Sequence, residues 1–168
     1  AGYAKIDEIP YDFIRKRLSV AVRVEGRAED LLICKGAVQN VVEACSSVLA
    51  QGTPVPMDAA RARAIDDKVR AWSGQGYRVL GIAIRRFPAR QAYGREDEAG
   101  LSFAGFLLFL DPPKPGMAQT LKALADRGIK VKVITGDNRY VAAHLAEIIG
   151  LPHGRILTGG EVSTLTKE

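Results

Sequence analysis

Three prolines within four residues divide the chain into two parts with different sequence patterns. Residues 111–115 (DPPKP) cannot lie inside a helix or a sheet, because proline fixes φ and has no amide hydrogen to donate. Long β-branched runs precede this segment, whereas helical patterns alternate with short apolar runs after it. We therefore predict one domain over residues 1–111 and a second, partial domain over residues 112–168.

The first part is expected to form an antiparallel sheet with flanking helix pairs, which is an α+β arrangement. Runs rich in β-branched and aromatic residues predict strands over residues 18–24, 30–34, 77–86 and 101–110, the last of them central. Apolar residues at helical spacing predict helices over residues 36–48 and 58–73. Loops are expected over residues 51–56 and 88–100, which are rich in glycine, proline or charge.

The second part has the pattern of an incomplete parallel α/β unit. Helices are expected over residues 117–127 and 139–149, and short apolar strands over residues 129–134 and 156–157. A strand without neighbours leaves its backbone groups unpaired, so residues 129–134 should either pair with a second molecule or be partly disordered. Self-association through this edge strand is therefore one of the two predicted outcomes.

Composition argues against nucleic-acid binding and against a membrane-spanning helix. The net charge of +5 comes from 24 basic and 19 acidic residues spread along the chain, and only 7% of the residues are aromatic. This pattern offers no stacking platform for nucleic acid. The longest apolar run, residues 101–110, is far shorter than the ~20 residues that a spanning helix needs. Cys34 and Cys45 lie in apolar surroundings, which is typical of reduced thiols.

The sharpest single motif is Thr135-Gly136-Asp137, which follows the predicted strand over residues 129–134. At the carboxyl end of a parallel strand, where open α/β sheets bind ligands, a hydroxyl and a flexible backbone N–H can hold phosphate oxygens. Alternatively, Asp137 is the N-cap of the helix that begins near Arg139. The motif taken alone favours neither interpretation.

Other positions offer contacts for an anionic ligand. The Lys35 ammonium is followed by Gly36, which permits close backbone approach. In the segment DEIPYDFIRKR, Tyr11 could stack on a purine and Lys16 could meet phosphates. The alternatives are a solvated lysine at a strand end and a solvated charge run with Phe13 in the core. Arg78 alone would be an exposed strand cation. Each alternative is favoured while its motif is taken alone.

Several other chemistries lack support in the sequence. His144 and His153 have no partner at metal-ligand spacing, so no metal site is predicted from them. Cys34 lacks a nearby base that would activate it as a nucleophile. The chain has neither the Walker A pattern nor the dinucleotide pattern Gly-x-Gly-x-x-Gly.

Taken in order, the motifs are similar to the cytosolic catalytic region of P-type cation-transporting ATPases. The segments that carry the resemblance are DEIPYDFIRKRLSV, ICKGA, GYRVLGIA, FLDPPKP and VKVITGDN. The similarity extends over essentially the whole chain, including ILTGGEVSTLT. The first motif and the PAR…DE…FLDPPK stretch resemble most closely the bacterial magnesium-transporting branch.

The resemblance implies a role for each motif. Tyr11, at a position where many members carry phenylalanine, would stack on the adenine of ATP, with Phe13 as the competing choice. The other nucleotide-binding residues implied are Lys16, Lys35, Gly36 and Arg78. The segment Asp111-Pro112-Pro113 resembles the hinge to the phosphorylation domain. Thr135, Gly136 and Asp137 match the second motif of the haloacid-dehalogenase-like phosphorylation domain, where the threonine steadies the transferring phosphoryl group.

Two family motifs are absent from this chain. They are the Asp-Lys-Thr-Gly-Thr segment with the phosphorylated aspartate, and the Gly-Asp-Gly-x-Asn-Asp segment that holds Mg²⁺. An aspartyl-phosphate mechanism needs both the nucleophile and the metal. The chain should therefore bind ATP without hydrolysing it, and Mg²⁺ would act only in the intact enzyme, not ligated by this chain alone.

The resemblance implies a fragment of a longer protein. The whole would couple ATP hydrolysis to cation transport, with Mg²⁺ as the cargo, and the chain would be a cytosolic domain of a bacterial inner-membrane protein. Its partners would be ATP and the remaining phosphorylation, actuator and membrane domains of the same polypeptide, with no nucleic acid. The alternatives are a stand-alone nucleotide-sensing or interaction module without catalysis, a plain structural domain, and an independent phosphatase, which the lack of an Asp-x-Asp motif disfavours.

Overall fold

The computed structural model describes residues 2–151 and 156–165. His153, considered above as a metal ligand, and residues 166–168 lie outside the described residues. The chain forms two compact units. Unit 1 comprises Ala1–Val69 and Val79–Leu108, and unit 2 comprises Arg70–Arg78 and Phe109–Glu168.

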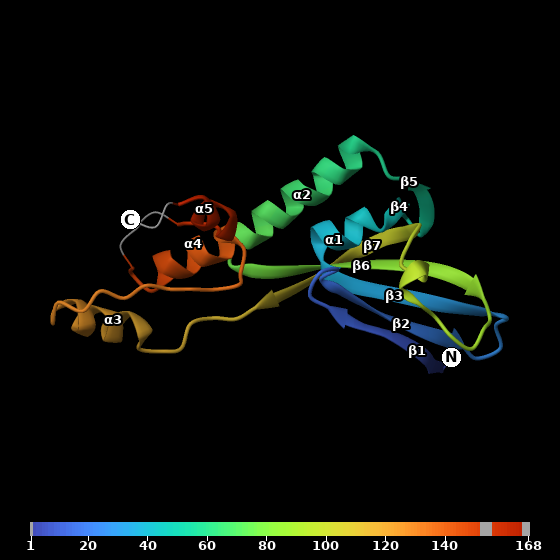
Figure 1. The fold of residues 1–168 in the computed structure, drawn as a ribbon, viewed down its shortest axis with the longest axis horizontal. Coiled ribbons are helices and arrows are strands. Elements are labelled where there is room, and N and C mark those ends of the chain that lie inside the picture. Colours follow the sequence, from blue (N-terminus) through green and yellow to red (C-terminus); the bar gives the residue numbers. More distant parts are fainter. Residues whose placement is uncertain (1, 152–155, 166–168) are drawn as a thin grey trace. The chain divides into compact units, whose positions relative to one another are not determined.

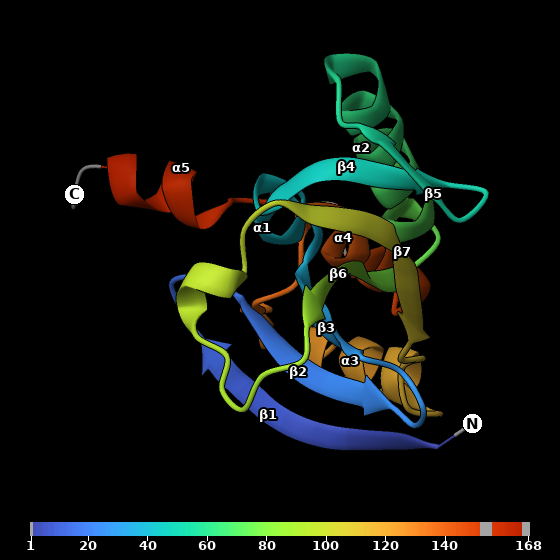
Figure 2. The same cartoon turned by 90° about the vertical axis from the view of Figure 1, so that its right-hand side faces the viewer.

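Unit 1 is built on a seven-stranded sheet in the order β1-β2-β3-β6-β7-β4-β5. The strands are β1 (Tyr3–Asp12), β2 (Arg17–Val24), β3 (Glu29–Ala37), β4 (Cys45–Ala50), β5 (Thr53–Pro56), β6 (Tyr77–Pro88) and β7 (Leu101–Leu110). Figure 2 shows them following one another around a curved sheet, from β1 at one edge to β5 at the other. The strands predicted for β2, β3, β6 and β7 are confirmed, and β7 is an interior strand as expected.

The sheet is mixed, so the prediction of a purely antiparallel sheet is wrong. β4 runs parallel to β7, with Cys45 opposite Leu101 and Val48 opposite Phe103. A parallel pair needs a long connection between its strands. Here the chain between them forms β5, the helix α2 (Ala59–Gly74) and β6.

Two elements of unit 1 contradict the sequence predictions. The helix expected over residues 36–48 is only α1 (Val38–Glu43), and Val48 lies in β4. The expected loop over residues 51–56 is the second half of a hairpin, in which the turn residues Gln51 and Gly52 both have positive φ. The prolines of β5 are tolerated because β5 is an edge strand.

The core of unit 1 lies between the sheet and its helices. Figure 1 shows α1 and α2 along the same side of the sheet. Apolar side chains from α1, α2, β3, β6 and β7 form one buried cluster, which includes Leu32, Val41, Ile65 and Phe103. Cys34 is buried in this cluster and Cys45 is half-buried, and both thiols are free.

The described part of unit 2 contains three further helices, α3 (Met117–Ala125), α4 (Arg139–Ile148) and α5 (Gly159–Thr164). The first two confirm the helical predictions. α5 was not predicted, although Thr158 and Glu161 form a capping box at its start.

The strands predicted over residues 129–134 and 156–157 are not formed. A strand is defined by hydrogen bonds to a neighbour, and in the described part of unit 2 no strand pairs with either segment. The side chains of Val133 and Ile134 are 52% and 98% exposed. The expected parallel α/β arrangement of this region is therefore not observed.

Candidate functional site

A tight turn between β1 and β2 contains Phe13 and Lys16, and Tyr11 lies beside it. Tyr11 lies near the end of β1, and Lys16 immediately precedes β2 with a φ of 50°. The Lys16 amide donates to the Asp12 carbonyl over 2.6 Å. The Asp12 carboxylate accepts from the backbone amides of Arg15 and Ile14 at 3.0 and 2.7 Å. These amides lower the pKa of Asp12, which therefore stays ionised.

Both aromatic residues of this segment face solvent. The Tyr11 and Phe13 side chains are 50% and 86% exposed, and their ring centroids lie 5.3 Å apart in an edge-to-face arrangement. The interpretation that places Phe13 in the core is therefore wrong. The turn presents an exposed aromatic pair, and either ring is accessible to a planar ligand.

The end of β3 meets the same turn. Gly36 pairs with Arg17, and the Ala37 amide donates to the Lys16 carbonyl over 3.0 Å. A Cβ on Gly36 would lie 2.7 Å from the Arg17 Cα and closer still to the Lys16 carbonyl oxygen. The missing side chain thus permits the contact, and Lys16, Lys35 and Gly36 are brought together.

The two lysines of this junction are exposed. Among the described residues, no carboxylate forms an ion pair with the ammonium of Lys16 or of Lys35. The junction therefore presents two cations without acidic partners beside an exposed aromatic pair. Such a surface suits an anionic ligand with a planar ring system.

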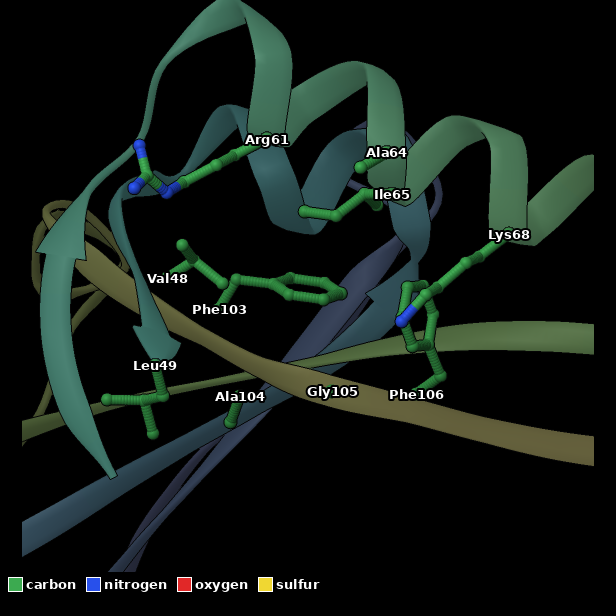
Figure 3. Close-up of a pocket in the computed structure, with 10 residues that line it drawn as sticks. All are labelled: Val48, Leu49, Arg61, Ala64, Ile65, Lys68, Phe103, Ala104, Gly105 and Phe106. Carbon is green, nitrogen blue, oxygen red and sulfur yellow. The ribbon is translucent and has the colours of Figure 1, made fainter. Parts of the chain in front are cut away.

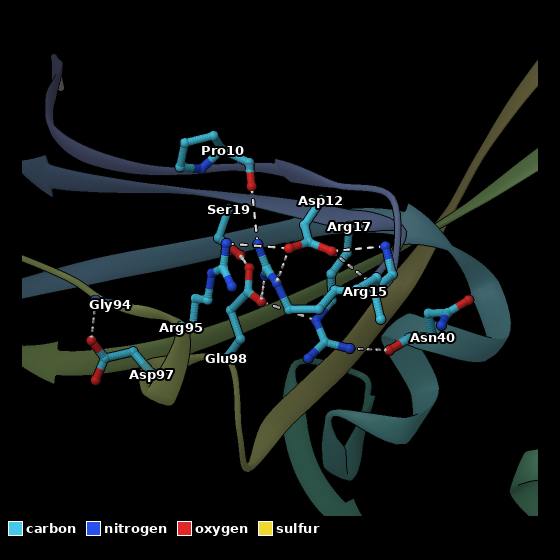
Figure 4. A network of polar contacts seen from close by, with 11 residues as sticks. Pro10, Asp12, Arg15, Arg17, Ser19, Asn40, Gly94, Arg95, Asp97 and Glu98 are labelled. Carbon is cyan, nitrogen blue, oxygen red and sulfur yellow. Dashed lines mark hydrogen bonds and ion pairs between the residues drawn. The ribbon is translucent and has the colours of Figure 1, made fainter.

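The arginines that flank Lys16 point toward Glu98, as Figure 4 shows. Arg15 donates through Nη1 to one carboxylate oxygen of Glu98, and Arg17 donates through Nε to the same oxygen over 3.0 Å. The Ser19 hydroxyl donates to the other oxygen over 2.7 Å. The Glu98 side chain is 0% exposed and each arginine only 15%. The interpretation of a solvated charge run is therefore wrong for Arg15 and Arg17.

Two more hydrogen bonds extend this network to the backbone. Arg15 donates through Nη2 to the Pro10 carbonyl over 3.0 Å, and Arg17 donates through Nη1 to the Asn40 carbonyl over 2.8 Å. Sequence reasoning missed Glu98 because it lies 83 residues from Arg15. The only local signal was the acidic run Glu96-Asp97-Glu98.

Unit 2 holds Arg78 and the motif at residues 135–137, which lie around the ion pair between Arg78 and Asp137. Arg78 and Asp137 form a bidentate pair, with Nε–Oδ1 at 2.7 Å and Nη2–Oδ2 at 3.0 Å. The Thr135 hydroxyl also donates to Asp137 over 2.9 Å. The Arg78 guanidinium lowers the pKa of Asp137, and the same contact raises the pKa of Arg78. The motif at residues 135–137 and Arg78 therefore form one cluster, in which a Cβ on Gly136 would meet open space.

The N-cap of α4 is Asn138 rather than Asp137. The Asn138 side-chain oxygen accepts from the Tyr140 and Val141 amides at 3.0 and 3.1 Å. The capping interpretation of Asp137 is therefore wrong, because its carboxylate is directed to Arg78. Asn138 also donates to the Ser73 hydroxyl over 3.0 Å, which ties α4 to the end of α2 within unit 2.

The predicted hinge residues Asp111, Pro112 and Pro113 lie between β7 and α3, in neither a helix nor a strand. The described residues include no group of three or more His, Cys, Asp or Glu side chains placed to hold a metal ion. Asp137 is the sole carboxylate of its motif and already accepts from Arg78 and Thr135. The donors present therefore do not by themselves fit a Mg²⁺ site.

A hollow of about 350 Å³ lies elsewhere in unit 1, between α2, β4 and β7 (Figure 3). Its lining is mostly apolar, including Val48, Ile65 and Phe103, with Arg61 and Lys68 at the rim. Arg61 is paired with Asp58. The lining includes none of the predicted site residues. In the part of the chain that is described, no helix combines the length and the apolar character needed to cross a membrane.

Comparison with known proteins gives consistent matches. Residues 1–116 match the family described as "P-type ATPase, cytoplasmic domain N". Over 167 residues, or 99% of the chain, it is 42% identical to "Magnesium-transporting ATPase, P-type 1" of Escherichia coli (strain K12) and 40% identical to a protein of that name in Salmonella typhimurium (strain LT2). It is 32% identical over 88% of its length to "Sodium/potassium-transporting ATPase subunit alpha-A" of Artemia franciscana. The chain spans only 16–18% of the length of these curated relatives.

Proposed function

Because the chain belongs to the P-type ATPases, whose cytoplasmic domain N matches residues 1–116, we propose that unit 1 binds ATP. The observation that carries this proposal is the junction of the β1–β2 turn with the end of β3. There the Ala37 amide meets the Lys16 carbonyl over 3.0 Å, and two exposed ammonium groups lie beside an exposed aromatic pair.

The chemistry of each residue suits one part of ATP. An adenine ring stacks on an exposed aromatic face, which Tyr11 provides, with Phe13 as the alternative. Lys16 and Lys35 supply positive charge for the phosphates. Gly36 is buried, and its lack of a side chain lets the β1–β2 turn that carries Lys16 pack against the end of β3.

We propose that residues of unit 2 contact the transferred phosphoryl group in the intact enzyme. The Thr135 hydroxyl, which here donates to Asp137, and the backbone N–H of Gly136, which has open space beside its Cα, are groups suited to phosphate oxygens. Arg78 is the cation of this cluster, and it donates to Asp137 through Nε and Nη2. A phosphate that binds here must compete with that carboxylate for the guanidinium.

The whole protein is proposed to couple ATP hydrolysis, through an aspartyl-phosphate formed outside this chain, to cation transport. The names of the bacterial relatives suggest Mg²⁺ as the cargo. The chain would then be a cytosolic part of a bacterial inner-membrane protein, with the rest of that polypeptide as its partner. Residues 1–111 would be the nucleotide-binding domain, 111–113 the hinge and 112–168 a partial haloacid-dehalogenase-like phosphorylation domain. By itself the chain is expected to be inactive.

A matched pair of tyrosine variants tests the adenine contact. We expect Tyr11→Ala to weaken ATP and ADP about equally, by roughly tenfold, because one stacked base contributes about 1–3 kcal/mol. Tyr3→Ala removes an exposed tyrosine from the other end of β1 and should leave both affinities unchanged. Isothermal titration calorimetry measures both affinities in each variant.

Each other outcome of this titration has a definite meaning. A loss confined to ATP would contradict the adenine role of Tyr11. The same loss in Phe13→Ala but not in Tyr11→Ala would move that role to Phe13. The alternative function has a separate test. If the chain binds nucleotide but the sequence of the full polypeptide has no aspartyl-phosphate motif, the nucleotide-sensing module would be favoured.

A further inference from the structure

The buried carboxylate of Glu98 holds both residues that flank Lys16 (Figure 4). Arg15 and Arg17 donate to the same Glu98 oxygen, and Ser19 donates to the other. The Glu98 side chain is 0% exposed and accepts from three side chains on the β1–β2 turn and β2. Lys16 lies between the two arginines and is exposed.

We propose that Glu98 is a positioning residue for nucleotide binding, which orients Lys16 by fixing the arginines on either side of it. This inference rests on the proposed binding of ATP by unit 1. Glu98 itself would not touch the nucleotide, because its carboxylate is buried and already accepts three hydrogen bonds.

The backbone of Lys16 needs such support. Its φ of 50° lies in the left-handed region, which a residue with a side chain adopts only at a conformational cost. Local contacts with Asp12 and Ala37 hold the Lys16 backbone. Glu98 adds a long-range restraint through Arg15, which also holds the Pro10 carbonyl, and through Arg17, which also holds the Asn40 carbonyl.

Asp30 provides a matched control for Glu98. Its carboxylate is also 0% exposed, and it accepts from Arg23 at 2.7 and 2.9 Å and from the Tyr93 hydroxyl at 2.7 Å. Asp30 lies near the start of β3, five residues before Lys35, which places it ~16 Å away along the strand. Replacing either carboxylate by its amide removes a buried charge of the same kind, but only Glu98 restrains the turn.

The test compares Glu98→Gln with Asp30→Asn at a temperature at which both are folded. Nitrogen-15 relaxation without nucleotide reports the mobility of residues 13–17. Titrations with ATP and with adenosine separate the phosphates from the ring. We expect Glu98→Gln to increase the mobility of the Lys16 amide and to weaken ATP about tenfold with adenosine changed less than about twofold, as for one lost charge-assisted contact. Asp30→Asn should match the wild type in all three.

The results that would contradict the positioning role differ from the result that would contradict ATP binding. An unchanged turn in Glu98→Gln, an equal loss of ATP and adenosine affinity, or the same effects in Asp30→Asn would overturn the positioning role. A wild-type chain that does not respond to ATP would contradict the proposed function itself. If Glu98→Gln does not fold, Arg17→Lys takes its place, because it keeps the charge at Glu98 but loses the guanidinium that bridges to Asn40.

Discussion

A single missing methyl group decides how closely β3 approaches the turn that carries Lys16. A Cβ on Gly36 would lie 2.7 Å from the Arg17 Cα, a distance that real Cβ contacts do not reach. The opposing atoms belong to the backbone, so they cannot rotate away. The junction proposed to bind phosphates therefore depends on glycine at this position.

Gly36→Ala should destabilise the chain and damage the site together. Overpacking at a backbone contact costs about 1–3 kcal/mol of unfolding free energy. Gly74→Ala is the matched control, because a Cβ there would meet nothing within 4 Å at the end of α2. Urea unfolding followed by circular dichroism measures both. A Gly36→Ala variant as stable as Gly74→Ala would show that the junction is looser than described.

Local chemistry and long-range pairing differ in what sequence can predict. Lys35 and Gly36 could be singled out because an ammonium and a flexible backbone are adjacent in the chain. Glu98 could not, because its partners lie about eighty residues away and only folding brings them together. The same pairing explains why Arg15 and Arg17 are buried despite lying in a charge-rich run.

The segment over residues 129–134 was predicted to be a strand but has no neighbouring strand to pair with in the described part of the chain. It has the apolar, β-branched character of a buried strand, yet Ile129, Val133 and Ile134 are at least half exposed. Exposed apolar backbone of this kind pairs readily with another chain. Self-association through this segment, or disorder within it, therefore remains our prediction.

Sedimentation velocity over a range of concentrations tests the segment. We expect the wild type to form dimers and Val133→Lys to remain monomeric, because a lysine opposes edge-to-edge pairing. Val162→Lys, at an equally exposed position in α5, should behave as the wild type. Hydrogen exchange provides the second measurement. A monomeric wild type with slowly exchanging amides over residues 129–134 would contradict both pairing and disorder.

Elements with a strong local pattern were predictable, and elements defined by their neighbours were not. β7 is a nearly continuous apolar run and α2 has apolar residues at helical spacing, and both were placed within one residue. β1 was missed because its ten residues are largely charged or exposed, with only Ile9 fully buried. β5 was missed because its two prolines suggest a loop, although an edge strand tolerates them.

At the scale of the whole molecule, the chain spans less than a fifth of the length of the curated relatives that it matches. Residues 1–116 carry the family match, and the curated relatives are more than five times as long as the chain. Unit 1 has its own sheet and core, whereas the described part of unit 2 has helices without a sheet. Nucleotide binding is the part of the family's chemistry that we propose for unit 1.

The most direct test of ATP binding is a titration of the wild-type chain followed through its backbone amide NMR shifts. We expect saturable shifts that cluster at Tyr11, Lys16, Lys35 and Gly36, with Arg78 responding in unit 2. Shifts concentrated instead around Phe103 and Phe106, which line the separate hollow, would contradict the placement of the site. The absence of any shift at millimolar ATP would contradict nucleotide binding by this chain.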